Sequence, residues 1–363
     1  MEKSNDWSSW DVIGASVQGP YHKNKGQPNE DAIGWYQKKP GNLPIILSEA
    51  DGLGDDMFFR SDRGSRFAIE ASIEICKRHI SKIHRWREGQ LRHRLLDEII
   101  ALWNQKIFED LKNHPFSPEE EQISTRHAQH FFSNLPEDTG LDKSVFIRSC
   151  PYSTTLNTVV VTPEAIIILQ VGDGDIVIVH HNGFTKEVFP KQLDCGRIIP
   201  LSYPNVRDFC NVCRRDMSEV MPLIIYLSSD GYSAGYDFEK AENPSFDEIV
   251  AFEFHSKIQE FSTTDIQEAL PSLLEEISQG SSDDLTLGII VGPQQRIRKT
   301  PLKLKKICDR VTEEKKEQES DELVVESGYV DPDINYHKPE RKCQPSDYNT
   351  TTELYYDIQN NET

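Results

Sequence analysis

Four strongly apolar segments of this chain each adjoin acidic residues, and this arrangement restricts the folds open to it. The segments are PIILSEADG, AIIILQVGDG, LIIYLSSDG and DDLTLGIIV. Short apolar runs bounded by turn residues are typical of buried β-strands. The acidic residues stand at the ends of these runs and not within helical patterns, so the sequence predicts several core strands with carboxylates at their ends.

The periodicity of apolar residues alternates between values near two and near 3.6, which predicts both strands and helices. Two helices are expected from residue 63 and from residue 91, and further helices near 246–261 and 266–277. Residues 115–150 are polar and acidic and are expected to cross the surface, partly as helix. The predicted fold class is α+β, a sandwich with helices outside, whose strands are expected at residues 12–17, 32–36, 44–47, 156–161, 165–171, 176–179, 185–189, 223–227 and 285–291.

The 363 residues carry a formal net charge of −20. A negative field of this size repels nucleic acid and anionic membranes, so neither is an expected partner, and phosphate chemistry would need local cations. The N-terminus has no signal-peptide pattern and no apolar run is long enough to cross a bilayer. Seven scattered cysteines then indicate reduced thiols in the cytoplasm. Cys210 and Cys213 form a lone CxxC, for which chance spacing is favoured over zinc or redox chemistry.

The composition changes beyond Gly292. A basic segment comes first, and an acidic, aliphatic-poor tail follows. Such a tail cannot bury enough apolar surface to offset the entropy of ordering it. We therefore expect a folded domain over residues 1–292 and a largely disordered tail over 293–363, whose tyrosines are candidates for contact with a protein partner.

The acidic residues at the strand ends allow two interpretations. An Asp-Gly pair is a strong turn signal, which explains any single cluster. The ends of neighbouring strands converge, however, and carboxylates about 4 Å apart repel by roughly 4 kcal/mol at an effective dielectric of 20. Crowded acids need protons or cations, and oxygen ligands without His or Cys favour Mg²⁺ or Mn²⁺. The whole set favours a metal site, with clusters at 29–31, 49–52, 172–175, 229–231 and 282–284.

Six motifs also occur in a recognisable order: GQPNEDAIGWY, ADGLGD, YSTTLNTVVV, VGDGDIVIV, SSDGY and SSDDLTLGIIV. Together they resemble the metal-dependent serine/threonine protein phosphatases of the type 2C family, most closely its divergent bacterial branch. The resemblance covers about residues 10–292. It implies a central antiparallel β-sandwich flanked by helix pairs, with two Mg²⁺ or Mn²⁺ ions, and an optional third, at one end.

The resemblance also assigns roles by position. Asp51 would bridge two metals, Asp230 and Asp283 would complete the ligands of one, and Glu30 and the Gly52 carbonyl would face the other. The catalytic set is then Asp51, Asp31 and Asp230, while Asp31, Asp173 and Asp284 would hold metal-bound waters, support the ligands or bind a third metal.

Two positions depart from the family pattern: one is expected to bind the substrate phosphate, and the other to protonate the leaving group. The position of a common phosphate-binding arginine is Gly26, so Lys25, His22 or Arg60 would have to supply the cation. The position of a histidine considered a general acid is Leu53. Neither change removes a metal ligand.

The leading hypothesis is hydrolysis of phosphoserine and phosphothreonine on proteins, opposing a kinase in signalling. A pseudophosphatase that binds a partner is the alternative, because Gly26 and Leu53 are unusual. A third interpretation is an acidic domain stabilised by metal without phosphate chemistry. Nucleotide binding is disfavoured because no phosphate-binding glycine motif follows a strand.

Overall fold

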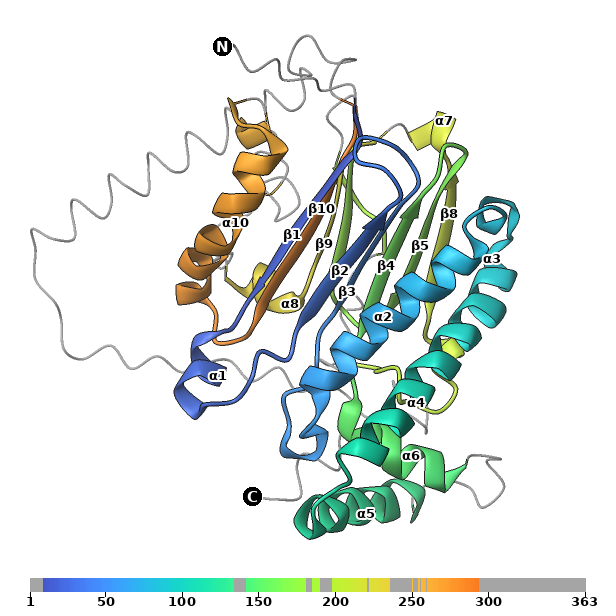
Figure 1. The fold of residues 1–363 in the computed structure, drawn as a ribbon, viewed down its shortest axis with the longest axis vertical. Coiled ribbons are helices and arrows are strands. Elements are labelled where there is room, and N and C mark those ends of the chain that lie inside the picture. Colours follow the sequence, from blue (N-terminus) through green and yellow to red (C-terminus); the bar gives the residue numbers. More distant parts are fainter. Residues whose placement is uncertain are drawn as a thin grey trace, which may run out of the picture.

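The computed structural model describes residues 9–133, 142–180, 185–189, 198–220, 222–235 and 260–293, together with 250, 254 and 256–258. Within them, two five-stranded antiparallel sheets face each other (Figure 1). The first has the order β1 (Asp11–Val17), β10 (Leu285–Val291), β9 (Pro222–Ser228), β6 (Asp175–His180), β7 (Thr185–Glu187). The second has the order β2 (Ala32–Gln37), β3 (Ile45–Ala50), β4 (Leu156–Val161), β5 (Ala165–Val171), β8 (Asn211–Asp216).

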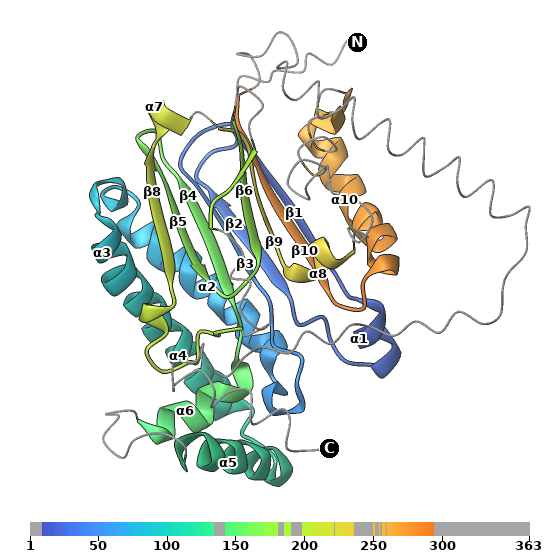
Figure 2. The same ribbon diagram turned by 180° about the vertical axis from the view of Figure 1, so that it is seen from behind.

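Helices cover the outer faces of both sheets. α2 (Ser61–His79) and α4 (Leu96–Asn113) lie over the second sheet, and α10 (Thr263–Ile277) lies over the first (Figures 1 and 2). The predicted α+β sandwich with flanking helices is therefore confirmed. Separate apolar cores fill the space under α2 and α4, the space under α10, and the space between the sheets. The short helices are α1 (Pro20–Lys25), α3 (Glu88–Gln90), α6 (Lys143–Ser149), α7 (Met217–Val220) and α8 (Asp230–Ala234).

The excursion at 115–150 is more helical than its polarity predicted. α5 (Pro118–Ser133) occupies most of it, followed by α6. Phe131 stacks on Phe146 with ring centroids 4.5 Å apart, so an aromatic contact joins the two helices. The sequence also failed to predict β8, which lies at a sheet edge in a proline- and cysteine-rich stretch. The expected helix near 246–261, the turn at 181–183 and the tail lie largely or wholly outside the described residues.

The CxxC cysteines lie on opposite faces of the second sheet. Cys210 belongs to the core under the helices, and Cys213 to the core between the sheets. Residues three apart in extended chain project to opposite sides, so the two thiols do not share a metal or a disulfide. Among the described residues we find no helix with the length and hydrophobicity that a bilayer crossing requires.

Candidate metal centre

The loops that carry the acidic clusters meet at one end of the sandwich. β2 and β3 pair with Ala32 opposite Ala50, so Asp31 and Asp51 follow on at the same end of that sheet. The other sheet contains β6, β9 and β10. There Ser228, at the end of β9, pairs with Asp175, the first residue of β6, and with Leu287, near the start of β10. This is the end at which α1 and α8 lie (Figure 1).

Gly52 and Gly231 show how closely these loops approach one another. A Cβ added to Gly52 would lie 2.7 Å from the carbonyl oxygen of Glu30, which joins the first and second motifs. A Cβ added to Gly231 would lie 2.0 Å from the carbonyl oxygen of Asp284, which joins the fourth and fifth. Any side chain at either position would push the acidic loops apart.

The carboxylates at this end interact strongly. Burial raises the pKa of Asp51 well above its usual value, and the neighbouring charges of Asp31, Asp230 and Asp283 raise it further. Like charges that are drawn out of water destabilise one another's ionised form. These interactions show that acids from four sequence motifs lie close together.

Glu30 and Asp31 have the same character. Burial, opposed in part by the nearby His22, raises the pKa of Glu30 to about 7. Burial and the charge of Asp284 raise the pKa of Asp31 to about 7. Both carboxylates are buried and have few compensating contacts: Oε2 of Glu30 lies 3.8 Å from Nε2 of His22, and the hydroxyls of Ser229 and Thr286 are the neutral groups that lower the pKa of Asp31. A buried, unsatisfied carboxylate is costly unless a proton or a cation compensates it.

This donor set fits a hard divalent cation. The crowded groups are carboxylates, with no thiolate among the predicted ligands, and such oxygens suit Mg²⁺ or Mn²⁺. Asp230 is the first residue of α8, Asp283 lies in the loop before β10, and Asp173 is exposed in the turn after β5. Within the described part of the chain, no three His, Cys, Asp or Glu side chains already enclose a cation-sized position. A cation would have to draw the oxygens together.

Asp284 organises the backbone around these acids. Its carboxylate oxygens accept hydrogen bonds from the amide of Gly19 and the amide of Glu30, both at 2.7 Å. Nδ1 of His22 lies 2.9 Å from the same carboxylate, and its Nε2 lies 3.8 Å from Oε2 of Glu30. This geometry suits the supporting role that the sequence predicted for Asp284. His22 is only 3% exposed, so it contacts Glu30 and Asp284 and does not face incoming phosphate.

Lys25, like Lys23, is an exposed cation on α1 at this end. It lies in the last turn of α1, with Nζ 4.1 Å from the centre of the Tyr21 ring and bonded to the Tyr21 hydroxyl. Gly26 caps this helix with φ of 66°, a left-handed conformation that favours glycine. The helix α1, which the sequence did not predict, thus explains why glycine occupies the position where the family commonly has arginine.

The guanidinium of Arg60 forms hydrogen bonds within the protein and does not face the acidic centre. Its guanidinium binds Glu120 through Nε and Nη2, each at 3.1 Å, and donates to the hydroxyl of Tyr152 at 2.8 Å and to the carbonyl of His114 at 2.6 Å. The side chain is buried and joins the start of α2 to the ends of α4 and α5. We therefore do not retain Arg60 as a phosphate ligand.

Replacing Arg60 with alanine should lower the free energy of unfolding by about 3 kcal/mol, because it breaks a buried charged network. Urea denaturation of the metal-free protein would measure this. Arg78→Ala is the matched control, since Arg78 forms only an exposed pair with Glu74 on α2 and should cost less than about 0.5 kcal/mol. Equal stability of the two variants, with a raised KM in Arg60→Ala, would return Arg60 to the phosphate site.

Sequence reasoning included Glu49 in the acidic cluster at 49–52 but gave it no role, and it missed Asn157. Glu49 and Asn157 are fully buried neighbours in β3 and β4, and Nδ2 of Asn157 donates to Oε2 of Glu49 at 2.7 Å. The signal was available, because each interrupts an apolar run. Leu53, at the position of the family's histidine, packs against the core under the helices and offers no proton.

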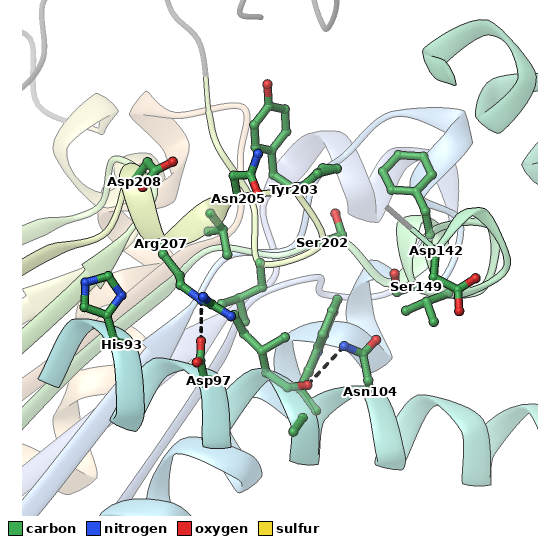
Figure 3. A pocket seen from close by; sticks show the side chains of 18 residues that line it. His93, Asp97, Asn104, Asp142, Ser149, Ser202, Tyr203, Asn205, Arg207 and Asp208 are labelled. Atoms are coloured by element: carbon green, nitrogen blue, oxygen red, sulfur yellow. Dashed lines mark hydrogen bonds and ion pairs between the residues drawn. The ribbon is translucent and has the colours of Figure 1, made fainter. Parts of the chain in front are cut away.

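A separate cavity of about 570 Å³ lies between α4, α6 and residues 201–208 (Figure 3). Trp103, Phe146 and Tyr203 are among its lining residues, and an ion pair between Arg207 and Asp97 lies at its side. The size suits a small-molecule site. None of the predicted metal ligands lines it, so the phosphate chemistry is not assigned to this cavity.

The chain matches the family model described as protein phosphatase 2C over residues 18–275. This range is more than two thirds of the 363 residues, and the chain belongs to the protein phosphatase 2C family. No curated protein matches it.

Solved structures with a similar fold include bacterial phosphatases. The serine/threonine phosphatase PstP/Ppp of Mycobacterium tuberculosis is 13% identical, with a TM-score of 0.44 over 78% of this chain and 99% of that one. A PstP catalytic domain in complex with two manganese ions is 14% identical, with a TM-score of 0.45 over 78% and 98%. Stp1 of Staphylococcus aureus is 12% identical, with a TM-score of 0.43 over 78% and 94%.

Proposed function

We propose that this protein hydrolyses phosphoserine and phosphothreonine on proteins with the help of two Mg²⁺ or Mn²⁺ ions. The observation that supports this most is the meeting of acidic motifs at one end of a phosphatase 2C sandwich, where the carboxylate oxygens of Glu30 and Asp31 are buried and the pKa of each group is raised to about 7. Such oxygens are poorly explained as turn residues, since turn carboxylates bond to nearby backbone amides.

The residues would divide the work as the family resemblance implies. Asp51, Asp230 and Asp283 would hold one ion, and Glu30 with the Gly52 carbonyl would face the other, with Asp51 shared between them. Asp31, Asp173 and Asp284 would support them, or hold a third ion. When bound, the ions supply charge neutralisation for the phosphoryl oxygens and lower the pKa of a water molecule.

The chain's own groups prepare the site. Asp284 holds the Glu30 backbone amide through a hydrogen bond and lies 2.9 Å from Nδ1 of His22, so the Glu30 backbone is fixed before a cation binds. Lys25, exposed beside the centre on α1, is the proposed contact for the substrate phosphate. Leu53 offers no proton, so water or another group must protonate the leaving serine or threonine oxygen.

A pseudophosphatase that binds a partner through this centre is the second candidate. Gly26 and Leu53 favour it, because both replace groups that contact phosphate or leaving group in the family. We further infer that residues 1–292 form the catalytic domain, that the enzyme opposes a kinase in the cytoplasm, and that the tail at 293–363 contacts a protein partner.

Purified full-length protein should release phosphate from a phosphothreonine peptide and from p-nitrophenyl phosphate when Mn²⁺ is present. EDTA should abolish the release, because it removes the ions that would neutralise the phosphoryl oxygens and lower the pKa of the attacking water. Phosphate release and Mn²⁺ binding are measured in parallel. Binding without turnover would support the pseudophosphatase, and the absence of Mn²⁺ binding would contradict the metal centre itself.

A further inference from the structure

Glu49 is a buried carboxylate for which the assigned roles leave no function. It lies in β3, two residues before Asp51, with 0% of its surface exposed. Residues two apart in a strand project to the same face, so Glu49 projects between the sheets with Ile45 and Leu47, and Asp51 follows one residue beyond the end of β3.

The hydrogen bonding of Glu49 is incomplete. Oε2 accepts the bond from Nδ2 of Asn157 at 2.7 Å, the residue directly opposite it in β4. Oε1 of Glu49 and Oδ1 of Asn157 are both buried without a partner. Two acceptor oxygens from adjacent strands therefore lack any donor, which is the situation that a cation resolves.

The pair lies against the acidic centre. A Cβ added to Gly174 would lie 2.3 Å from Nδ2 of Asn157 and 3.4 Å from Oε2 of Glu49, so the GDG turn packs directly on the pair. Burial raises the pKa of Glu49, and the charges of Asp31, Asp230 and Asp173 raise it further. Glu49 is thus close to carboxylates from three of the acidic motifs.

We propose that Glu49 is an additional oxygen ligand of the metal centre, and that Asn157 orients it through its amide. This inference rests on the proposed metal centre and deepens it. A purely structural pair at this depth would gain more from two apolar side chains, since a buried carboxylate with an unpaired oxygen destabilises the fold. The extra anionic oxygen strengthens the binding of divalent ions from beneath Asp51.

Glu49→Gln tests the role, because glutamine keeps an oxygen for the Asn157 amide and removes only the charge. Mn²⁺ titration followed by electron paramagnetic resonance of the free ion should show affinity about 10–100-fold weaker than wild type. The metal-free melting temperature should equal or exceed that of wild type, because the variant also removes one of several crowded acids. The control is Ser48→Ala. The hydroxyl of Ser48 contacts Ser72 and Thr158 on the face of β3 opposite to Glu49, so this variant should leave the Mn²⁺ affinity unchanged.

The outcomes separate two failures. Wild-type protein without Mn²⁺ binding would overturn the proposed metal centre. Wild-type binding that Glu49→Gln leaves unaltered would overturn only the role of Glu49. Should Glu49→Gln not fold, the double variant Glu49→Leu/Asn157→Leu removes both polar partners together, a change that a buried site tolerates better, and the same loss of Mn²⁺ affinity is expected from it.

Discussion

Asp51→Asn should lower kcat/KM for a phosphothreonine peptide by about 10³-fold or more, while making the metal-free protein more stable. Activity is expected to fall because Asp51 is the carboxylate that we propose the two ions share. Stability rises because Asp51 is half-buried among Asp31, Asp230 and Asp283, whose charges all raise its pKa. Removing one of four mutually repelling acids should add about 1–2 kcal/mol to the free energy of unfolding.

The measurements are steady-state kinetics with Mn²⁺ and urea denaturation in EDTA. Asp230→Asn should lose activity in the same way. Asp97→Asn serves as the matched control, since Asp97 lies on α4 and pairs with Arg207 away from the centre; its activity should match wild type. Two results would contradict the assignment of Asp51: retained Mn²⁺-dependent turnover in Asp51→Asn, or a metal-free variant less stable than wild type.

The strands and long helices were predictable because their residues follow simple periodicities. β4 and β5 have the predicted bounds, 156–161 and 165–171, since burial on both faces leaves a short, mostly apolar run in each strand. β8 has mixed burial at a sheet edge, so its pattern is weak. α1 has only six residues, too few to show a helical period.

The sequence predicted that acidic strand ends would lie close together, but it did not predict the contacts around them. Strand ends with acidic residues indicated that Glu30, Asp31 and Asp51 would meet. Sequence could not show that His22 is buried against Asp284, or that Arg60 is bound by Glu120, because these contacts depend on how loops and helices pack. Charge alone does not distinguish a cation that faces substrate from one that joins two helices.

The metal-free protein should lose stability as the pH rises from 5 to 8, and Mn²⁺ should remove this loss. Folding raises the pKa of Glu30 from 4.5 to about 7 and that of Asp31 from 3.8 to about 7. Between the unfolded and folded values, the folded protein holds protons that the unfolded chain releases, so raising the pH favours unfolding. Glu30 alone accounts for roughly 3 kcal/mol, at 1.36 kcal/mol per pKa unit.

Bound Mn²⁺ replaces those protons as the compensating charge, and its affinity increases as the carboxylates ionise. Melting temperatures across this pH range, in EDTA and in saturating Mn²⁺, test the expectation. Glu30→Gln should reduce the slope in EDTA, because glutamine does not titrate, whereas Glu74→Gln on the exposed face of α2 should leave it unchanged. Parallel pH profiles with and without Mn²⁺ would show that the buried carboxylates at the end of the sandwich are not where the metal binds.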